Sequence, residues 1–136
     1  MIGSFKGDYA WLSNMWPCRI VVDNLEFSSV EAAYQACKCA DINDRIHFVG
    51  INGYQAKRRG RHIGLRGDWD AIKLNVMQDL VRTKFRDPRL ADHLRETNGQ
   101  ELIEGNNWHD TFWGVCNGQG ENWLGRILMQ VRKELP

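Results

Sequence analysis

Three polar residues of different chemistry, Glu31, Gln35 and Lys38, recur within eight positions of the chain. If residues 28–40 form a helix, the spacing of four and then three places the carboxylate, the amide and the amine along one line. Tyr34 borders the same line, next to the apolar side of that helix. A row of this kind at the margin of a buried face can form one wall of an active-site cleft.

A structural explanation of the same residues stays open. Ser28-x-x-Glu31 spells a capping box, in which the glutamate would only close the start of the helix. Glu31 and Lys38 are also two turns apart, which is compatible with an ordinary solvated face.

A second cluster, Asn-Asn-Trp-His-Asp-Thr-Phe-Trp-Gly, occupies residues 106–114. Polar groups buried without hydrogen-bond partners are costly, and the mixture of aromatic and polar side chains suits a ligand with planar faces and hydroxyls, such as a nucleoside. The alternative is a structural plug in which the tryptophans complete the core. Asp110, which lies among the aromatic residues, favours the functional interpretation.

Two further patterns are typical of anion binding. Residues 118–122 (Gly-Gln-Gly-Glu-Asn) precede a helix, where exposed backbone N–H groups and the helix dipole favour a phosphate. Residues 57–62 (Lys-Arg-Arg-Gly-Arg-His), followed by Arg66, form the only dense basic stretch and suit an arginine clamp on phosphates. The alternatives are an ordinary glycine turn, in which Glu121 would repel an anion, and a solvated helix face.

The elements that must position these residues follow from hydrophobic periodicity and turn signals. The sequence predicts one domain over residues 1–136, with a helix-rich α+β fold in which a small β-part packs on several helices. The expected elements are strands at 18–22 and 25–27 joined by an Asp23-Asn24 turn, helices at 28–40, 42–49, 54–62, 69–85, 88–96 and 123–135, a strand at 101–104, and a loop with a strand inside it at 106–122.

Composition excludes several classes of protein. The formal charge is +1, from 18 basic and 17 acidic residues, so no global field attracts nucleic acid or an anionic membrane. The chain shows no secretory signal and no apolar run near the roughly 20 residues of a membrane span, and a cytoplasmic location is expected. Cys37 and Cys39 would point apart on a helix, and no P-loop or dinucleotide fingerprint occurs. We expect no metal and no cofactor.

A series of motifs occurs in order along the chain, at 12–17 (LSNMWP), 29–38 (SVEAAYQACK), 56–61 (AKRRGR), 65–70 (LRGDWD), 76–77 (VM), 84–85 (KF), 109–114 (HDTFWG) and 118–125 (GQGENWLG). Taken together, these motifs resemble the NADAR/YbiA-like family over almost the whole chain. That family consists of N-glycosidases, and the resemblance therefore implies cleavage of a bond between ribose and a base nitrogen, with a ribose phosphate in the site.

The resemblance implies catalytic roles for Glu31, Lys38 and Asp110. The carboxylates would stabilise an oxocarbenium-like ribose or activate water, and Lys38 would stabilise negative charge or attack the anomeric carbon. The expected substrate-binding residues are Asn14, Tyr34, Gln35, Arg58, Arg61, Trp69, Trp113, Gly114 and Asn122.

The substrate stays open between two branches of the family. One acts on ADP-ribosyl-guanine in nucleic acid, and the other on ribosylamino-pyrimidine phosphates of riboflavin synthesis. A non-catalytic ADP-ribose- or NAD-binding module is the alternative function, and a nucleic-acid-binding protein built on the basic stretch is a third. No membrane partner is expected.

Overall fold

The computed structural model describes residues 1–136 without a gap. Helices dominate and the strands are short, so the predicted helix-rich α+β class is confirmed. The elements in chain order are η1 (Gly7–Leu12), β1 (Ile20–Val22), β2 (Leu25–Phe27), α1 (Val30–Cys37), η2 (Ile42–Phe48), α2 (Gly53–Arg59), η3 (Gly60–His62), α3 (Trp69–Lys84), α4 (Pro88–Glu96), β3 (Gly105–Asn106), β4 (Val115–Cys116) and α5 (Trp123–Glu134), where η marks a 3-10 helix.

Contacts within the chain group these elements into two compact units, named here for their place in the sequence. The middle unit, Asn14–Lys84, contains β1, β2, α1, η2, α2, η3 and α3. The terminal unit combines Met1–Ser13 with Phe85–Pro136 and contains η1, α4, β3, β4 and α5. A single domain over 1–136 stays a prediction.

In the middle unit, β1 and β2 form the predicted antiparallel hairpin, in which Ile20 pairs with Phe27. Asp23 and Asn24 both take positive φ angles of 50° and 66°. Positive φ at both central residues is the signature of a type I′ turn, whose twist matches that of the strands. The buried side chains of Ile20 and Phe27 thus lie opposite each other on one face, and the hairpin contacts α1 and α3.

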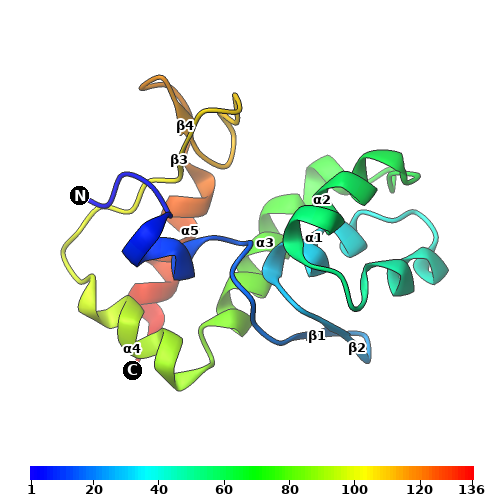
Figure 1. Cartoon of the computed structure of the whole chain (residues 1–136), viewed down its shortest axis with the longest axis horizontal. Helices are drawn as coiled ribbons and strands as arrows, with labels where there is room; N and C mark the ends of the chain where they lie inside the picture. The colour runs from blue at the N-terminus through cyan, green and yellow to red at the C-terminus, as the bar shows by residue number, and fades with distance from the viewer. The chain divides into compact units, whose positions relative to one another are not determined.

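Helix α1 lies at the centre of the middle unit, and all eight of its residues are buried. It contacts α2, η2, α3 and both strands (Figure 1). The predicted Ser28–Glu31 capping box is wrong by one residue, because the N-cap is Ser29, whose hydroxyl accepts a hydrogen bond from the N–H of Ala32. Glu31 therefore closes no capping box.

The basic stretch forms α2 and η3 rather than one helix. Asn52 and Gln55 make a complete capping box at the start of α2, so the helix begins at Gly53 instead of the predicted Tyr54.

Asp41 caps η2 by accepting from the N–H of Asn43. The long helix predicted at 69–85 is confirmed as α3.

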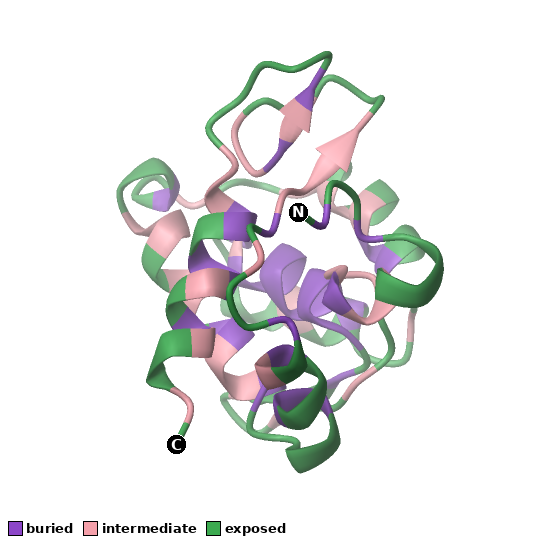
Figure 2. Cartoon of the chain, turned by 90° about the vertical axis from the view of Figure 1, so that its left-hand side faces the viewer, coloured by how far each residue is buried: buried purple, intermediate pink, exposed green.

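In the terminal unit, Figure 1 shows β3 and β4 at the N-terminal end of α5 and α4 near its C-terminal half. Asp87 caps α4 and Pro88 occupies its first turn, as predicted. Figure 2 draws the segment with β3 and β4 mostly in the colours of intermediate and exposed residues, and its buried members are Gly114 and Cys116.

The predicted strand at 101–104 is wrong. Residue Leu102 makes only an isolated parallel bridge with Ile2. The N–H of Gly105 bonds back to the carbonyl of Ile103 over 2.9 Å, and this tight turn ends the pairing. The parallel pair of the unit is instead β3 with β4, in which Gly105 pairs with Val115.

No helix in the structure is both long and apolar enough to cross a membrane.

Candidate active site

The predicted row of polar residues is present on α1. Glu31 and Gln35 are only 8% and 5% exposed. The amide Nε2 of Gln35 donates a hydrogen bond of 2.9 Å to Oε1 of Glu31. Lys38 follows on the same side as the C-cap of the helix and is half-buried. A carboxylate buried beside an amide donor and an amine is a costly arrangement for a purely structural helix, and it is typical of functional sites.

Helix α2 holds this row in place through its glycines. A Cβ atom at Gly53 would collide with Met15 and press on Glu31, and one at Gly60 would collide with the amide of Gln35. Because neither glycine has a side chain, α2 approaches α1 closely over two turns. The N–H of Glu31 also donates to the carbonyl of Asn14 at 3.0 Å, which fixes the start of the row.

The carbonyl Oε1 of Gln35 is buried and accepts no hydrogen bond. It lies against the backbone of Gly60, where an added Cβ atom would collide with it. The side-chain amide of Gln35 therefore donates to the carboxylate of Glu31, and Gln35 orients that carboxylate.

The backbone of Lys38 is anchored on both sides. Its carbonyl accepts from the N–H of Arg66 at 2.9 Å, and the N–H of Ala40 donates to the carbonyl of Gly64 at 2.9 Å. Cys39 and Leu65 form the antiparallel bridge between these two bonds. This pairing fixes the backbone from which the Lys38 side chain extends.

Burial lowers the pKa of the Lys38 amine below its usual value, and Glu31 acts in the opposite direction. The nearby ammonium groups of Lys73 and Lys57 lower this pKa further. The Nζ atom lies 5.0 Å from the centre of the Tyr34 ring. A lysine with a lowered pKa is more often neutral, and a neutral amine is a nucleophile.

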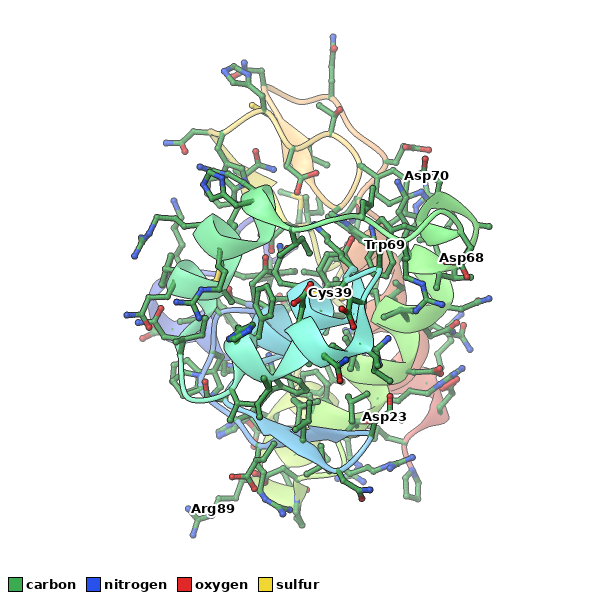
Figure 3. The ribbon with its side chains drawn as sticks, turned by 90° about the vertical axis from the view of Figure 1, so that its right-hand side faces the viewer. Asp23, Cys39, Asp68, Trp69, Asp70 and Arg89 are labelled. Atoms are coloured by element: carbon green, nitrogen blue, oxygen red, sulfur yellow. The ribbon has the colours of Figure 1, made fainter.

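Tyr34 and Trp69 form an aromatic pair beside this lysine, with ring centres 5.1 Å apart and planes tilted by 59°. Trp69 begins α3, and Figure 3 shows it directed inward while the flanking aspartates Asp68 and Asp70 lie at the edge. Asp68 holds Arg66 in a salt bridge of 2.6 Å. Two of the three predicted aromatic residues therefore lie in the same environment as Lys38.

The two arginines predicted to bind phosphate are not part of this row. Arg58 is exposed and lies on the side of α2 opposite its two glycines, and Arg61 is exposed in η3. Lys57, their neighbour, is the basic residue on the α1-facing side. The sequence places Lys57 in the basic stretch without distinguishing it from the arginines, and the only sequence signal for Lys73 is its four-residue step from Trp69 on α3.

The remaining predicted residue of the middle unit, Asn14, has a structural contact. Its amide lies 3.5 Å from the sulfur of Met77, and its carbonyl supports Glu31. The predicted role in binding ribose stays a prediction.

In the terminal unit, Asp110 organises its own loop. Its Oδ1 accepts from the N–H groups of Phe112 and Trp113 at 3.1 and 2.9 Å, whereas no hydrogen bond within the chain reaches Oδ2. Asn106 holds Asp110 in turn, by donating to its carbonyl at 2.8 Å and accepting from its N–H at 3.1 Å. One oxygen of this carboxylate is thus anchored and the other faces no donor of the chain.

Several donors of the expected phosphate site before α5 have partners within the chain. The N–H groups of Glu121, Trp123 and Leu124 donate to the carbonyls of residues 111, 112 and 113. Asn122 uses both ends of its amide on backbone, accepting from Glu104 at 2.9 Å and donating to Leu102 at 3.0 Å. These donors hold the loop that carries Asp110, and they are not directed at a ligand.

Gly114 and Trp113 also have local partners. A Cβ at Gly114 would collide with the carbonyl of Glu104, so glycine is needed for this close approach. Trp113 packs edge-on against Phe112, with ring centres 4.8 Å apart. Stacking of Trp113 on a substrate base stays a prediction.

No group of three His, Cys, Asp or Glu side chains gathers as a metal-ligating cluster. All four cysteines are free thiols. Burial raises the pKa of Cys37 and of Cys39, which makes both poor nucleophiles at neutral pH.

Comparison with known proteins gives consistent matches. Residues 3–136 match the family model described as the NADAR domain. The chain is 34% identical to the N-glycosidase YbiA of Shigella boydii, over 97% of this chain and 85% of that protein. It is 31% identical to an N-glycosidase of Nostoc punctiforme, over 93% and 86% of the two chains.

A riboflavin biosynthesis protein of Vibrio vulnificus is 38% identical over 94% of this chain, but the match spans only 36% of that longer protein. Among solved structures, the NMR structure of the E. coli protein YbiA superposes with a TM-score of 0.85. Sequence identity in that superposition is 32%, and it covers 97% of this chain and 81% of the other.

Proposed function

The chain belongs to the NADAR domain family, and from that premise we propose that it is an N-glycosidase that hydrolyses the bond between a ribose and a base nitrogen. The observation that carries the proposal is Lys38, whose pKa is lowered by burial, on the same helix face as the buried Glu31–Gln35 pair. The names of the N-glycosidase relatives support the same reaction class.

The chemistry suits a carboxylate and an amine. Breaking the bond between C1′ and the base builds positive charge on the ribose, and the carboxylate of Glu31 stabilises that charge. The departing base takes the bonding electron pair and then a proton. Water finally adds to C1′, giving the free sugar and the free base.

Lys38 has two possible tasks in this reaction. As an ammonium it stabilises negative charge on the substrate. As a neutral amine it attacks C1′ while the bond to the base breaks; the ring then opens to a Schiff base, and water hydrolyses the imine to return the amine. The lowered pKa supports the covalent route, because it increases the share of neutral amine.

Asp110 is the third proposed catalytic residue, as the carboxylate that activates water. Its open Oδ2 supports this role, since a base needs an oxygen that is not already saturated by donors. Anchoring of Oδ1 fixes the direction in which Oδ2 points.

The proposed substrate is a ribosylated base that carries a phosphate on its ribose, either ADP-ribosyl-guanine or a ribosylamino-pyrimidine phosphate. The riboflavin biosynthesis name of the Vibrio relative supports the second, but the match covers only part of that protein. The aromatic pair Tyr34–Trp69 beside Lys38 suits a planar ligand in either case.

Base release measured by chromatography tests the proposal. An ADP-ribosylated guanine oligonucleotide and the ribosylamino-pyrimidine phosphate are supplied in parallel to the wild type and to Glu31→Gln. Release from one substrate, lost in the variant, identifies the branch. No release from either by folded protein contradicts the proposal and leaves an ADP-ribose-binding module as the function, which calorimetry would detect as saturable binding.

A further inference from the structure

Two lysines lie on two separate helices that both pack on α1, the helix of Lys38. The first, Lys57, lies one turn after Gly53 and less than one turn before Gly60 on α2. Those glycines are the residues through which α2 approaches Glu31 and Gln35. Lys57 therefore lies on the side of α2 that faces the polar row, and it is half-buried.

The second, Lys73, lies one turn after Trp69 on α3. The ring of Trp69 packs on Tyr34, which neighbours Lys38 on α1. Residues four apart on a helix share one face, so Lys73 lies on the α3 face that meets α1. It is half-buried and forms a long ion pair of 3.5 Å with the exposed carboxylate of Asp70.

Electrostatics agrees with this placement. Both Lys57 and Lys73 lower the pKa of Lys38, as positive charges on neighbouring helices do. Three amines thus come from three packed helices, and Glu31 is the carboxylate that raises the pKa of Lys38. An anionic ligand bound between these helices would interact favourably with each ammonium group.

We propose that Lys57 and Lys73 form an anion subsite beside Lys38 that binds the phosphate attached to the substrate's ribose. This inference rests on the proposed function for the identity of the sugar. A lysine ammonium is a compact point charge with three donors. The two ammonium groups of Lys57 and Lys73 together match the charge of a phosphate group. The subsite lies where the reacting sugar must be, since C1′ has to reach Lys38 or Glu31.

The assignment differs from the arginine clamp expected from the sequence. Arg58 lies on the opposite side of α2, whereas Lys57 and Lys73 come from two helices that both pack on α1. A subsite supported by two packed helices is more rigid than one on an exposed helical turn, and rigid placement is what positions a substrate for reaction.

Calorimetric titration with ribose 5-phosphate, ADP-ribose and unphosphorylated ribose tests the subsite. The proteins are the wild type, Lys57→Gln, Lys73→Gln and the matched control Lys133→Gln, an exposed lysine of α5. We expect the wild type and the control to bind at least one phosphorylated ligand more tightly than ribose. Each of the other variants should lose about tenfold or more of that affinity, the loss of one charge-assisted contact.

Lys57→Arg and Lys73→Arg are measured beside these variants, with circular dichroism to verify folding. They keep the charge and should keep the affinity within about threefold. Unchanged affinity in both glutamine variants overturns the subsite, and so does an equal loss in the arginine variants, because packing would then be the cause. A wild type that prefers neither phosphorylated ligand over ribose overturns it as well.

The two phosphorylated ligands separate the possible sources of the phosphate, a terminal monoester or the pyrophosphate of ADP-ribose. The outcome is also separable from that of the glycosidase proposal. Phosphate-dependent binding without base release from either substrate would leave the subsite standing and remove the proposed function. Base release without lysine-dependent binding would support the proposed function and overturn the subsite.

Discussion

The side-chain amide of Gln35 donates its hydrogen bond to the carboxylate of Glu31 one helical turn away, in the buried interior of the middle unit. Gly60 closes the other side of that amide, since any side chain there would collide with it. The orientation of the proposed catalytic carboxylate therefore depends on a residue that lacks a side chain, on a different helix.

Substitution of Gly60 by alanine should displace the amide of Gln35 and misalign Glu31. We expect kcat to fall about 10- to 100-fold, because small misplacements of catalytic groups are that costly. The cost in unfolding free energy should be about 1–3 kcal/mol, as for other overpacked positions. Initial rates and denaturant unfolding measure the two effects.

Gly64→Ala is the matched control for that change. A Cβ at Gly64 would meet only the Cβ of Ala40, at an ordinary 4.0 Å. Its rate should match that of the wild type. Equal losses of activity in the two variants would show that the contact between Gly60 and Gln35 has no special role.

Borohydride reduction during turnover should trap the ribosyl group on Lys38 if the covalent route operates. Mass spectrometry of the reduced protein locates the adduct, which should be absent from Lys38→Met and from protein reduced without substrate. If the enzyme is fully active but gives no adduct, the covalent route is contradicted, and Lys38 acts by stabilising negative charge on the substrate.

The pH dependence of kcat/KM should show a limb that rises as Lys38 loses its proton, because the neutral amine is the nucleophile. Lys57 and Lys73 lower the pKa of Lys38 and Glu31 raises it. Removing a neighbouring cation in Lys57→Gln or Lys73→Gln raises that pKa, so the limb should move to higher pH. Lys133→Gln should leave the profile where it is; a limb that stays fixed in all three variants contradicts this assignment.

Asp110→Asn and Asp110→Ala separate the chemistry of this residue from its structural role. Asparagine retains an oxygen that can accept from Phe112 and Trp113, whereas alanine removes it. We expect both variants to lose about 100-fold or more in kcat, as other general bases do. Only the alanine variant should also lose about 1 kcal/mol of unfolding free energy. An active Asp110→Asn enzyme would leave the residue with a structural role alone.

Local signals explain what the sequence predicts well. The Asp23-Asn24 turn gives the hairpin because these two residue types tolerate positive φ angles. The start of α4 follows in the same way from Asp87, which caps the helix, and Pro88, which occupies its first turn. In each case the chemistry of neighbouring residues is sufficient.

Distant partners explain where the sequence misleads. Ser28 and Ser29 are equally good caps, but the hydroxyl of Ser28 donates to the carbonyl of Ile51 at 2.6 Å, and Ser29 takes the cap. Similarly, Lys57 and Lys73 become neighbours of Lys38 only because α2 and α3 both pack on α1. Neither outcome is encoded within a short window of sequence.

The carbonyl groups of residues 111–113 accept hydrogen bonds from residues at the start of α5, and these bonds restrict the motion of the loop that contains the carbonyls. Local opening of the loop that carries Asp110 and Trp113 has to break the bonds to the N–H groups of Trp123 and Leu124. These N–H groups belong to the first turn of α5 and have no partner within the helix, so opening of the loop exposes both to solvent. Hydrogen exchange at these two amides measures how often the loop leaves its native conformation.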